Sequence, residues 1–223
     1  MRLSQLQYGA FLSYCPRGDS REIRHSKNVM LALKNDKFVG TPPILISQYV
    51  AQTIQRYRTA LKFPGTALPF DSFFQSDTIL VPTPRSSRMR PDTLWVPHRI
   101  ATALVRVGLG KEVIPYLKRV EPVRKAHLSA PEDRPRAAEH YESMMVQSGL
   151  TEPDEIVLVD DIVTRGATLL GAANRLASAF PKTRIRAFAV MRTISNPDEF
   201  KKLNDPCVGT ITLQPSGDTL RRP

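Results

Sequence analysis

One short run of the chain constrains its fold more than any other feature. Residues 156–168 read Ile-Val-Leu-Val-Asp-Asp-Ile-Val-Thr-Arg-Gly-Ala-Thr: an apolar stretch, two adjacent aspartates, and a turn of small and hydroxylated residues. The apolar part is typical of a buried β-strand, and the pattern over 166–180 predicts a helix directly after the turn. In open α/β sheets, ligands bind at the carboxyl ends of strands, and a helix N-terminus presents free N–H groups to an anion. The run therefore predicts an anion-binding edge of an α/β sheet.

The residues of the turn have the chemistry of a phosphate site beside a sugar. Gly166 allows the backbone to approach a phosphate closely, and the hydroxyls of Thr164 and Thr168 can donate to it. Asp160 and Asp161 are poorly suited to bind phosphate, but they suit the hydroxyls of a ribose or a hydrated Mg²⁺. We therefore expect a sugar-phosphate site. The alternative is that the two aspartates only cap the following helix.

Alternating strands and helices are predicted on both sides of this run. The strands are expected at 8–14, 78–81, 112–117, 155–159, 185–191 and 207–213, and the helices at 21–33, 44–61, 95–107 and 166–180. Continuous apolar strands that alternate with helices predict an α/β fold with a mostly parallel sheet covered on both faces. We expect a strand and helices over 1–70 that pack on a core over 71–223, with a long polar loop over 118–142.

The formal net charge of +11 indicates an anionic partner, which could be a nucleic acid, a membrane surface or a small polyphosphate. The basic residues occur in short groups along the chain, so a solvated basic surface is an equal alternative. No stretch approaches the roughly 18 apolar residues of a membrane span, and no secretory signal pattern is present. Cys15 and Cys207 lack the spacing of a zinc site. We expect a cytoplasmic protein with no membrane partner.

The run over 156–168 resembles the phosphoribosyl-diphosphate (PRPP) motif of the type I phosphoribosyltransferases, apart from Arg165, where that family usually has Thr or a small residue. The resemblance implies the type I fold, with an N-terminal arm, a small hood and, as is common in the fold, a homodimer. It also implies transfer of the phosphoribosyl group from Mg²⁺-bound PRPP to a nitrogen nucleophile, with release of pyrophosphate. The implied sites are Asp160 and Asp161 for the ribose hydroxyls and, indirectly, the metal, and Thr164, Arg165, Gly166, Ala167 and Thr168 for the 5′-phosphate.

A second resemblance, to the ComF-type amidophosphoribosyltransferase-like proteins, rests on Val-Pro-Thr-Pro-Arg at 81–85 and Pro-Val-Arg-Lys-Ala-His-Leu-Ser at 122–129. The zinc ribbon common at the N-terminus of those proteins is missing, and Arg-Pro-Asp-Thr-Leu-Trp at 90–95 replaces their Arg-Gly-Phe-Asn-Gln. The resemblance implies a flexible loop over 118–142. It implies pyrophosphate binding by Thr83, Pro84 and Arg85, with Lys125, His127 and Arg134 as candidates to close over it.

The sequence does not indicate which molecule accepts the phosphoribosyl group, because no base-binding pattern occurs between 191 and 223. The ComF-type proteins are tied to DNA uptake, and this link supports a second hypothesis beside the transferase. Under it, the chain is a non-catalytic member of the fold that senses PRPP or a nucleotide, or that binds nucleic acid through its basic surface.

Overall fold

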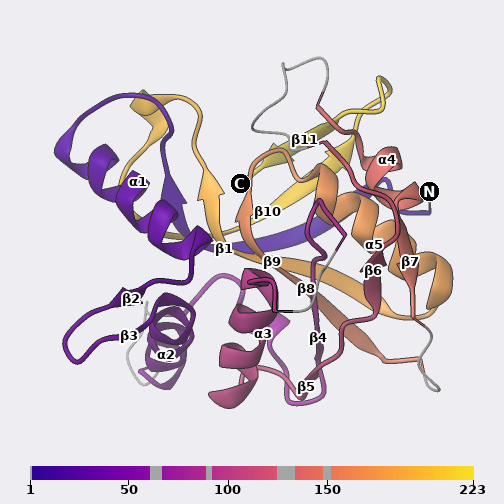
Figure 1. Ribbon diagram of the computed structural model, residues 1–223, viewed down its shortest axis with the longest axis horizontal. Helices are drawn as coiled ribbons and strands as arrows, with labels where there is room; N and C mark the ends of the chain where they lie inside the picture. Colours follow the sequence, from indigo (N-terminus) through magenta and orange to yellow (C-terminus); the bar gives the residue numbers. More distant parts are fainter. Residues whose placement is uncertain (1, 61–66, 89–91, 125–133, 148–151) are drawn as a thin grey trace.

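The computed structural model describes residues 2–60, 67–88, 92–124, 134–147 and 152–223, and its central feature is a mixed β-sheet (Figure 1). Within the described residues, seven strands pair in the order β11-β10-β1-β9-β8-β4-β5. They are β1 (Gln5–Tyr14), β4 (Ile79–Pro82), β5 (Glu112–Val113), β8 (Glu155–Val163), β9 (Arg184–Thr193), β10 (Asn204–Leu213) and β11 (Thr219–Arg222). The strands β1, β9, β8, β4 and β5 are mutually parallel, whereas β10 and β11 turn back antiparallel beyond β1.

Helices cover both faces of this sheet, which confirms the predicted α/β class. They are α1 (Arg21–Lys34), α2 (Ile46–Thr59), α3 (Val96–Arg106), α4 (Ala137–Glu142) and α5 (Ala167–Ala179), with short 3₁₀ turns η1 (Asp71–Phe73) and η4 (Pro197–Glu199). Two small hairpins accompany them, β2 (Phe38–Val39) with β3 (Ile44–Leu45) and β6 (Leu117–Arg119) with β7 (Met144–Val146). None of the helices in the described ranges has the length and apolarity needed to cross a membrane.

Alternate residues of the parallel strands supply two separate cores. In β8, Val157 and Val159 belong to the apolar cluster that includes α2 and α3, whereas Ile156 and Leu158 belong to the cluster that includes α5. All four side chains are fully buried. Figure 1 shows α2 and α3 together below the sheet and α5 apart from them. A strand buried on both faces explains the unbroken apolar sequence before the two aspartates.

Most predicted elements are present, with two corrections. The strand expected at 112–117 is divided: β5 ends at Val113, and β6 begins at Leu117 in a separate hairpin. Pro115 lies between them, and a proline has no N–H group to donate to a sheet ladder. The polar segment at 118–142 is not irregular throughout, because its described parts contain the end of β6 and the helix α4. Lys125 and His127 lie outside the described residues.

The position of β1 determines which residues reach the predicted site. β1 lies inside the sheet, between β9 and β10, so residues of the expected N-terminal segment contribute a strand to the core sheet itself. Its register places Tyr14 opposite Thr193 at the end of β9. Parallel strands end at the same edge of a sheet, so the segments that follow β1, β9, β8 and β4 begin close to one another.

Candidate functional site

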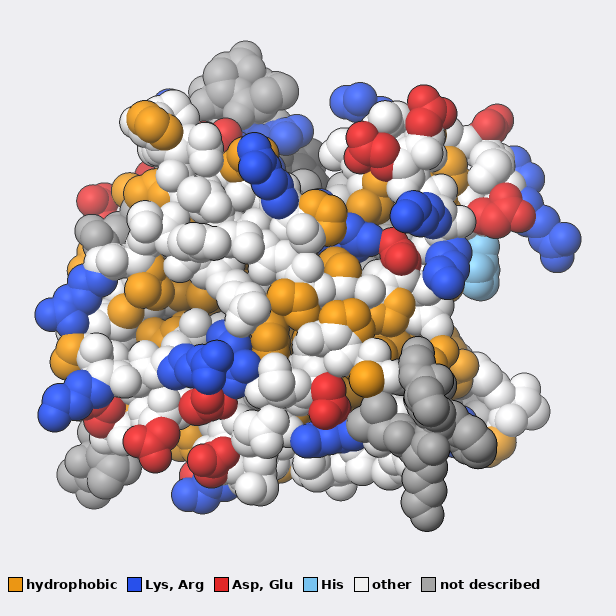
Figure 2. Space-filling view, turned by 180° about the vertical axis from the view of Figure 1, so that it is seen from behind, with side chains coloured by type: hydrophobic (Ala, Val, Ile, Leu, Met, Phe, Trp, Pro, Cys, Tyr) orange, Lys and Arg blue, Asp and Glu red, His pale blue; other side chains and the backbone are white. Residues whose placement is uncertain are grey.

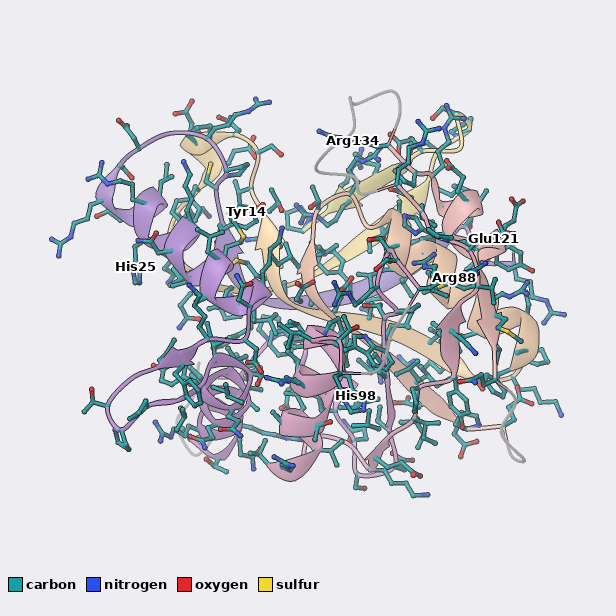
Figure 3. The ribbon with its side chains drawn as sticks, in the orientation of Figure 1. Tyr14, His25, Arg88, His98, Glu121 and Arg134 are labelled. Atoms are coloured by element: carbon teal, nitrogen blue, oxygen red, sulfur yellow. The ribbon has the colours of Figure 1, made fainter. Side chains whose placement is uncertain are left out.

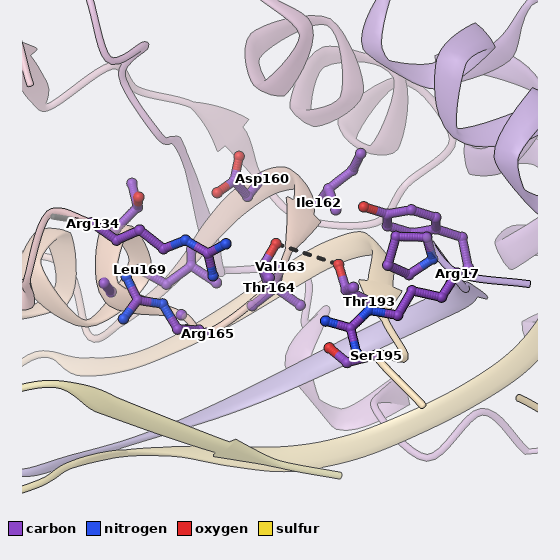
Figure 4. A pocket seen from close by; sticks show the side chains of 15 residues that line it. Arg17, Arg134, Asp160, Ile162, Val163, Thr164, Arg165, Leu169, Thr193 and Ser195 are labelled. Carbon is purple, nitrogen blue, oxygen red and sulfur yellow. Dashed lines mark hydrogen bonds between the residues drawn. The ribbon is translucent and has the colours of Figure 1, made fainter. Parts of the chain in front are cut away.

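A pocket of about 510 Å³ opens at this carboxyl edge, over the ends of β1, β8 and β9 and the start of α5 (Figure 4). It is lined by Tyr14, Pro16, Arg17, Arg134, Asp160, Ile162, Val163, Thr164, Arg165, Gly166, Ala167, Thr168, Leu169, Thr193 and Ser195. The lining includes three arginines and a single carboxylate, Asp160. A pocket of this charge suits an anionic ligand that also carries hydroxyl groups.

The N-terminus of α5 forms one wall of the pocket. Gly166 is the N-cap residue, with φ at 87°, and no side chain caps the helix. The next three residues, 167–169, line the pocket, and N–H groups in a first helical turn have no acceptor within the helix. A Cβ atom at Gly166 would lie 2.6 Å from the Ile211 side chain, so this position requires glycine for its backbone angle and for space. The arrangement leaves backbone donors free for an anion.

Hydroxyl and guanidinium groups surround that helix end. Thr164 and Thr193 form a hydrogen bond between their hydroxyls, with 3.3 Å between the oxygens. Arg165 is half-buried and its Nη1 donates to Asp218 Oδ1 at 2.6 Å, so its charge is partly neutralised. Figure 4 shows Arg134 and Arg165 on one side of Thr164 and Arg17 on the other. Nε of Arg134 is buried and makes no hydrogen bond in the described structure.

Asp160 is the carboxylate that faces the pocket. Its Oδ1 accepts a hydrogen bond from the Asp161 N–H at 3.0 Å, and Asp161 Oδ1 accepts from the Ile162 N–H at 2.8 Å. Burial raises the pKa of Asp160 well above its usual range, and the neighbouring Asp161 carboxylate raises it further, whereas a hydrogen bond from the Thr83 side chain acts in the opposite direction. A ligand that brings hydroxyl donors or a cation to Asp160 would favour its ionised form.

The described residues contain no group of three or more His, Cys, Asp or Glu side chains placed to hold a metal ion. Protein sites for Mg²⁺ commonly supply only one or two carboxylates, and the substrate's phosphates and water supply the other ligands. The pair at Asp160 and Asp161 fits that pattern and does not fit a cation site built from protein groups alone.

The structure brings together most of the residues that the motif singled out. Thr164, Arg165, Gly166, Ala167 and Thr168 line one pocket with Asp160 and Arg134. Asp161 is not among the lining residues, and neither are Thr83, Pro84 and Arg85. Thr83 is buried and reaches the site through its hydrogen bond to Asp160. Nη1 of Arg85 donates to the Leu94 carbonyl at 2.6 Å, away from the pocket.

Sequence analysis did not identify Arg221, a residue that supports the turn at 164–168 through hydrogen bonds. Arg221 of β11 donates from Nε to the Thr164 carbonyl at 2.6 Å and from Nη1 to the Tyr8 hydroxyl at 2.6 Å. Its Nη2 donates to the carbonyl of Thr193. One side chain therefore joins the turn after β8 to the last residue of β9 and to Tyr8 within β1, and nothing in the local sequence around 221 indicates this role.

A buried histidine contacts the first turn of α5. His140 of α4 is 5% exposed, and its Nε2 lies 3.3 Å from the Thr168 hydroxyl oxygen. Burial lowers the pKa of His140 to about 3, and the positive charges of Arg119 and Arg165 lower it in the same direction. The imidazole is therefore neutral at physiological pH, and it can orient the Thr168 hydroxyl without adding charge to the pocket.

Tyr14, Arg17, Thr193 and Ser195 were also missed as lining residues, although a signal for them existed. Each lies at or just beyond the carboxyl end of β1 or β9. The rule that ligands bind at such ends applies to them once the two strands are known to be neighbours.

No protein-family model matches the sequence, and no curated protein matches it. Solved structures that are similar to it at low identity include the following two. The protein TT1426 from Thermus thermophilus is 15% identical over 70% of this chain and 85% of that chain, with a TM-score of 0.33. A glutamic acid mutant, from an analysis of an invariant aspartic acid in HPRTs, is 13% identical over 76% of this chain and 93% of that chain, also with a TM-score of 0.33.

Proposed function

We propose that this protein is a phosphoribosyltransferase, which binds PRPP with Mg²⁺ in the pocket at the carboxyl edge and transfers the 5-phosphoribosyl group to a nitrogen nucleophile. One observation carries the proposal. The N-terminus of α5, which follows the left-handed Gly166 and has no side-chain cap, lies in the same cationic pocket as the Asp160 carboxylate. A helix end alone would suit any anion. The addition of Asp160 favours an anion that also presents hydroxyls.

The roles follow from the positions of the groups. The 5′-phosphate would accept hydrogen bonds from the first turn of α5 and from the hydroxyls of Thr164 and Thr168. Arg17 and Arg134 would add positive charge near it. Asp160 would accept hydrogen bonds from the ribose hydroxyls, and Asp161 would act through the water shell of the metal. When bound, Mg²⁺ would neutralise charge on the pyrophosphate group.

In the transfer, the lone pair of the acceptor nitrogen forms a bond to C1 of the ribose. The bond from C1 to the pyrophosphate oxygen breaks, and pyrophosphate leaves with that electron pair, while the acceptor nitrogen releases a proton to solvent. Positive charge develops on the ribose as the leaving group departs, and the Asp160 carboxylate is placed to stabilise it. Thr83, Pro84 and Arg85 remain our candidates for pyrophosphate, because the Thr83 side chain bonds Asp160 and so joins this segment to the ribose end.

Calorimetric titration of PRPP with Mg²⁺ tests the binding half of this proposal. We expect micromolar binding by the native protein and binding at least about tenfold weaker by Asp160→Asn. The variant loses the negative charge of the carboxylate that accepts hydrogen bonds from the ribose hydroxyls. Asp154→Asn is the matched control, since Asp154 is an exposed residue just before the amino end of the same strand. Absence of binding by the native protein would contradict the proposal.

Turnover is tested separately, by pyrophosphate release with a panel of amines and nucleobases. One observation favours a second candidate, a protein that binds PRPP without transfer: the Arg85 guanidinium donates to the Leu94 carbonyl and does not line the pocket. Tight PRPP binding without release of pyrophosphate for any acceptor would support that candidate.

Nucleic-acid binding has less support on the face shown in Figure 2, where Lys and Arg are interspersed with Asp and Glu.

A further inference from the structure

A second pocket of about 460 Å³ lies beside the segment at 83–85, and neither the motif nor the proposed reaction uses it. It is lined by Arg88, Trp95, Pro115, Leu117, Lys118, Arg119, Val120 and Gln147. None of these residues lines the first pocket. Figure 3 shows Arg88 toward β6 and α4, whereas Tyr14, which lines the first pocket, lies toward α1.

The side chains that line this pocket carry a net positive charge. Three of its lining residues, Arg88, Lys118 and Arg119, are cationic, and no Asp or Glu lines it. None of the three is within ion-pair distance of a carboxylate in the described parts of the chain. The Asp160 carboxylate acts on Arg119 through electrostatic attraction, without a direct ion pair in the described residues. The three cations repel one another, so an anion bound among them would be stabilised.

Arg119 shows that the positive charge is built into the protein interior. It is only 3% exposed. Its Nε donates to the Arg85 carbonyl at 2.9 Å and its Nη1 to the Ser143 hydroxyl at 2.5 Å, while Nη2 is buried and has no hydrogen-bond partner in the described structure. Buried N–H groups are normally paired, so an unpaired one is a reason to expect a ligand. Burial lowers the pKa of Arg119 to about 10, while the charge of Asp160 acts to raise it, and the guanidinium is still charged at neutral pH.

The rest of the lining favours a flat ring. Trp95 stacks on His98, with 5.1 Å between ring centroids and 28° between ring planes. Its Nε1 already donates to the Thr83 carbonyl at 2.7 Å, so the indole has no N–H left for a ligand and offers only ring surface. Pro115, Leu117 and Val120 add apolar groups beside it.

We propose that this second pocket is a binding site for a planar aromatic anion, a ring that carries a carboxylate or phosphate group. The ring would lie against Trp95 and the apolar side chains, and the anionic group would be held by Arg119 and Lys118. The site is also connected to the first pocket. Trp95 and Arg119 both bond carbonyls of the 83–85 segment, and the side chain of Thr83 bonds Asp160. The proposal stands independently of the transfer reaction.

The test uses the fluorescence of Trp95, which lines this pocket and is the only tryptophan of the chain. Three probes separate the two halves of the proposed chemistry: benzoate has a ring and a charge, benzamide has the ring without the charge, and sulfate has charge without a ring. We expect benzoate to change the fluorescence with saturation, and benzamide and sulfate to bind at least about tenfold more weakly.

Lys118→Met and Lys111→Met form a matched pair of variants. Both lysines are exposed, so neither change disturbs the core, and only Lys118 lines the pocket. We expect Lys118→Met to weaken benzoate binding about fivefold or more, and Lys111→Met to leave it unchanged. Three results would overturn the proposal: equal binding of benzamide and benzoate, saturation by sulfate at lower concentration than by benzoate, or equal benzoate affinity in the two variants.

Discussion

At the scale of single residues, Gly166 combines two constraints that can be measured apart. Its left-handed backbone angle disfavours any side chain, and a Cβ atom there would also meet Ile211 at 2.6 Å. Gly108 has a similar angle, with φ at 80°, but nothing lies within 4 Å of its Cβ position. We expect Gly108→Ala to lower the free energy of unfolding by about 1 kcal/mol and Gly166→Ala to lower it by about 2–4 kcal/mol. Urea unfolding measures both, and equal losses would show that Ile211 yields without cost.

His140 makes the stability of the protein depend on pH with a known sign. Its pKa is lowered to about 3 in the folded state, against about 6.5 in an unfolded chain. Between these values only the unfolded state holds the proton, so acidification favours unfolding. From pH 7 to pH 5 the native protein should therefore lose about 2 kcal/mol more stability than His140→Gln. The raised pKa of Asp160 acts with the opposite sign, but it is present in both proteins and cancels in the comparison.

The control for this pH experiment is His25→Gln, since His25 is exposed on α1 and Figure 3 shows it at the periphery of the molecule. That variant should follow the native curve. If His140→Gln also follows the native curve, the His140 imidazole takes up a proton as readily in the folded state as in the unfolded chain, and its burial does not keep it neutral at pH 5.

At the scale of secondary-structure elements, the β10–β11 hairpin supports the turn that follows β8. It contributes Asp218 to the ion pair with Arg165, and Arg221 to the three hydrogen bonds that join Thr164, Thr193 and Tyr8. We expect Arg221→Met to weaken PRPP binding at least about tenfold, because the turn loses its support although no ligand contact is removed. The neighbouring Arg222→Met is the control, since Arg222 is exposed on the same strand. Calorimetric titration of the two variants measures their affinities for PRPP, and equal affinities would contradict a supporting role for Arg221.

The same elements show how far sequence alone could go. The helices at 21–34 and 96–106 were predicted to within about two residues, because apolar periodicity is a local signal. The turn at 164–168 was also predicted from a local pattern, the small and hydroxylated residues that follow the two aspartates. Arg221 and His140 reach that turn across 57 and 28 residues, and no local pattern encodes such pairings. The division of the expected strand by Pro115 was available in the sequence and was overlooked.

At the scale of the whole molecule, the net charge of +11 and the pocket make different predictions about salt. Any polyanion is attracted by the overall charge, but this attraction is screened as the Debye length falls from about 10 Å at 0.1 M salt to about 3 Å at 1 M. Charges in contact inside a pocket are partly buried and are screened much less than charges on the surface. A ligand held there should therefore keep most of its affinity at high salt, whereas a polyanion on the surface should lose it.

Thermal unfolding with and without ligand separates the two cases. At about 100 times its dissociation constant, PRPP with Mg²⁺ should stabilise the folded state by about 2.7 kcal/mol. For a chain of this length that corresponds to a rise in Tm of roughly 5–10 °C. We expect the rise to persist in 1 M salt and to be smaller for Asp160→Asn, while any stabilisation by single-stranded DNA disappears. If the PRPP effect disappears with salt in parallel with the DNA effect, the ligand is held by net charge and the pocket is not its site.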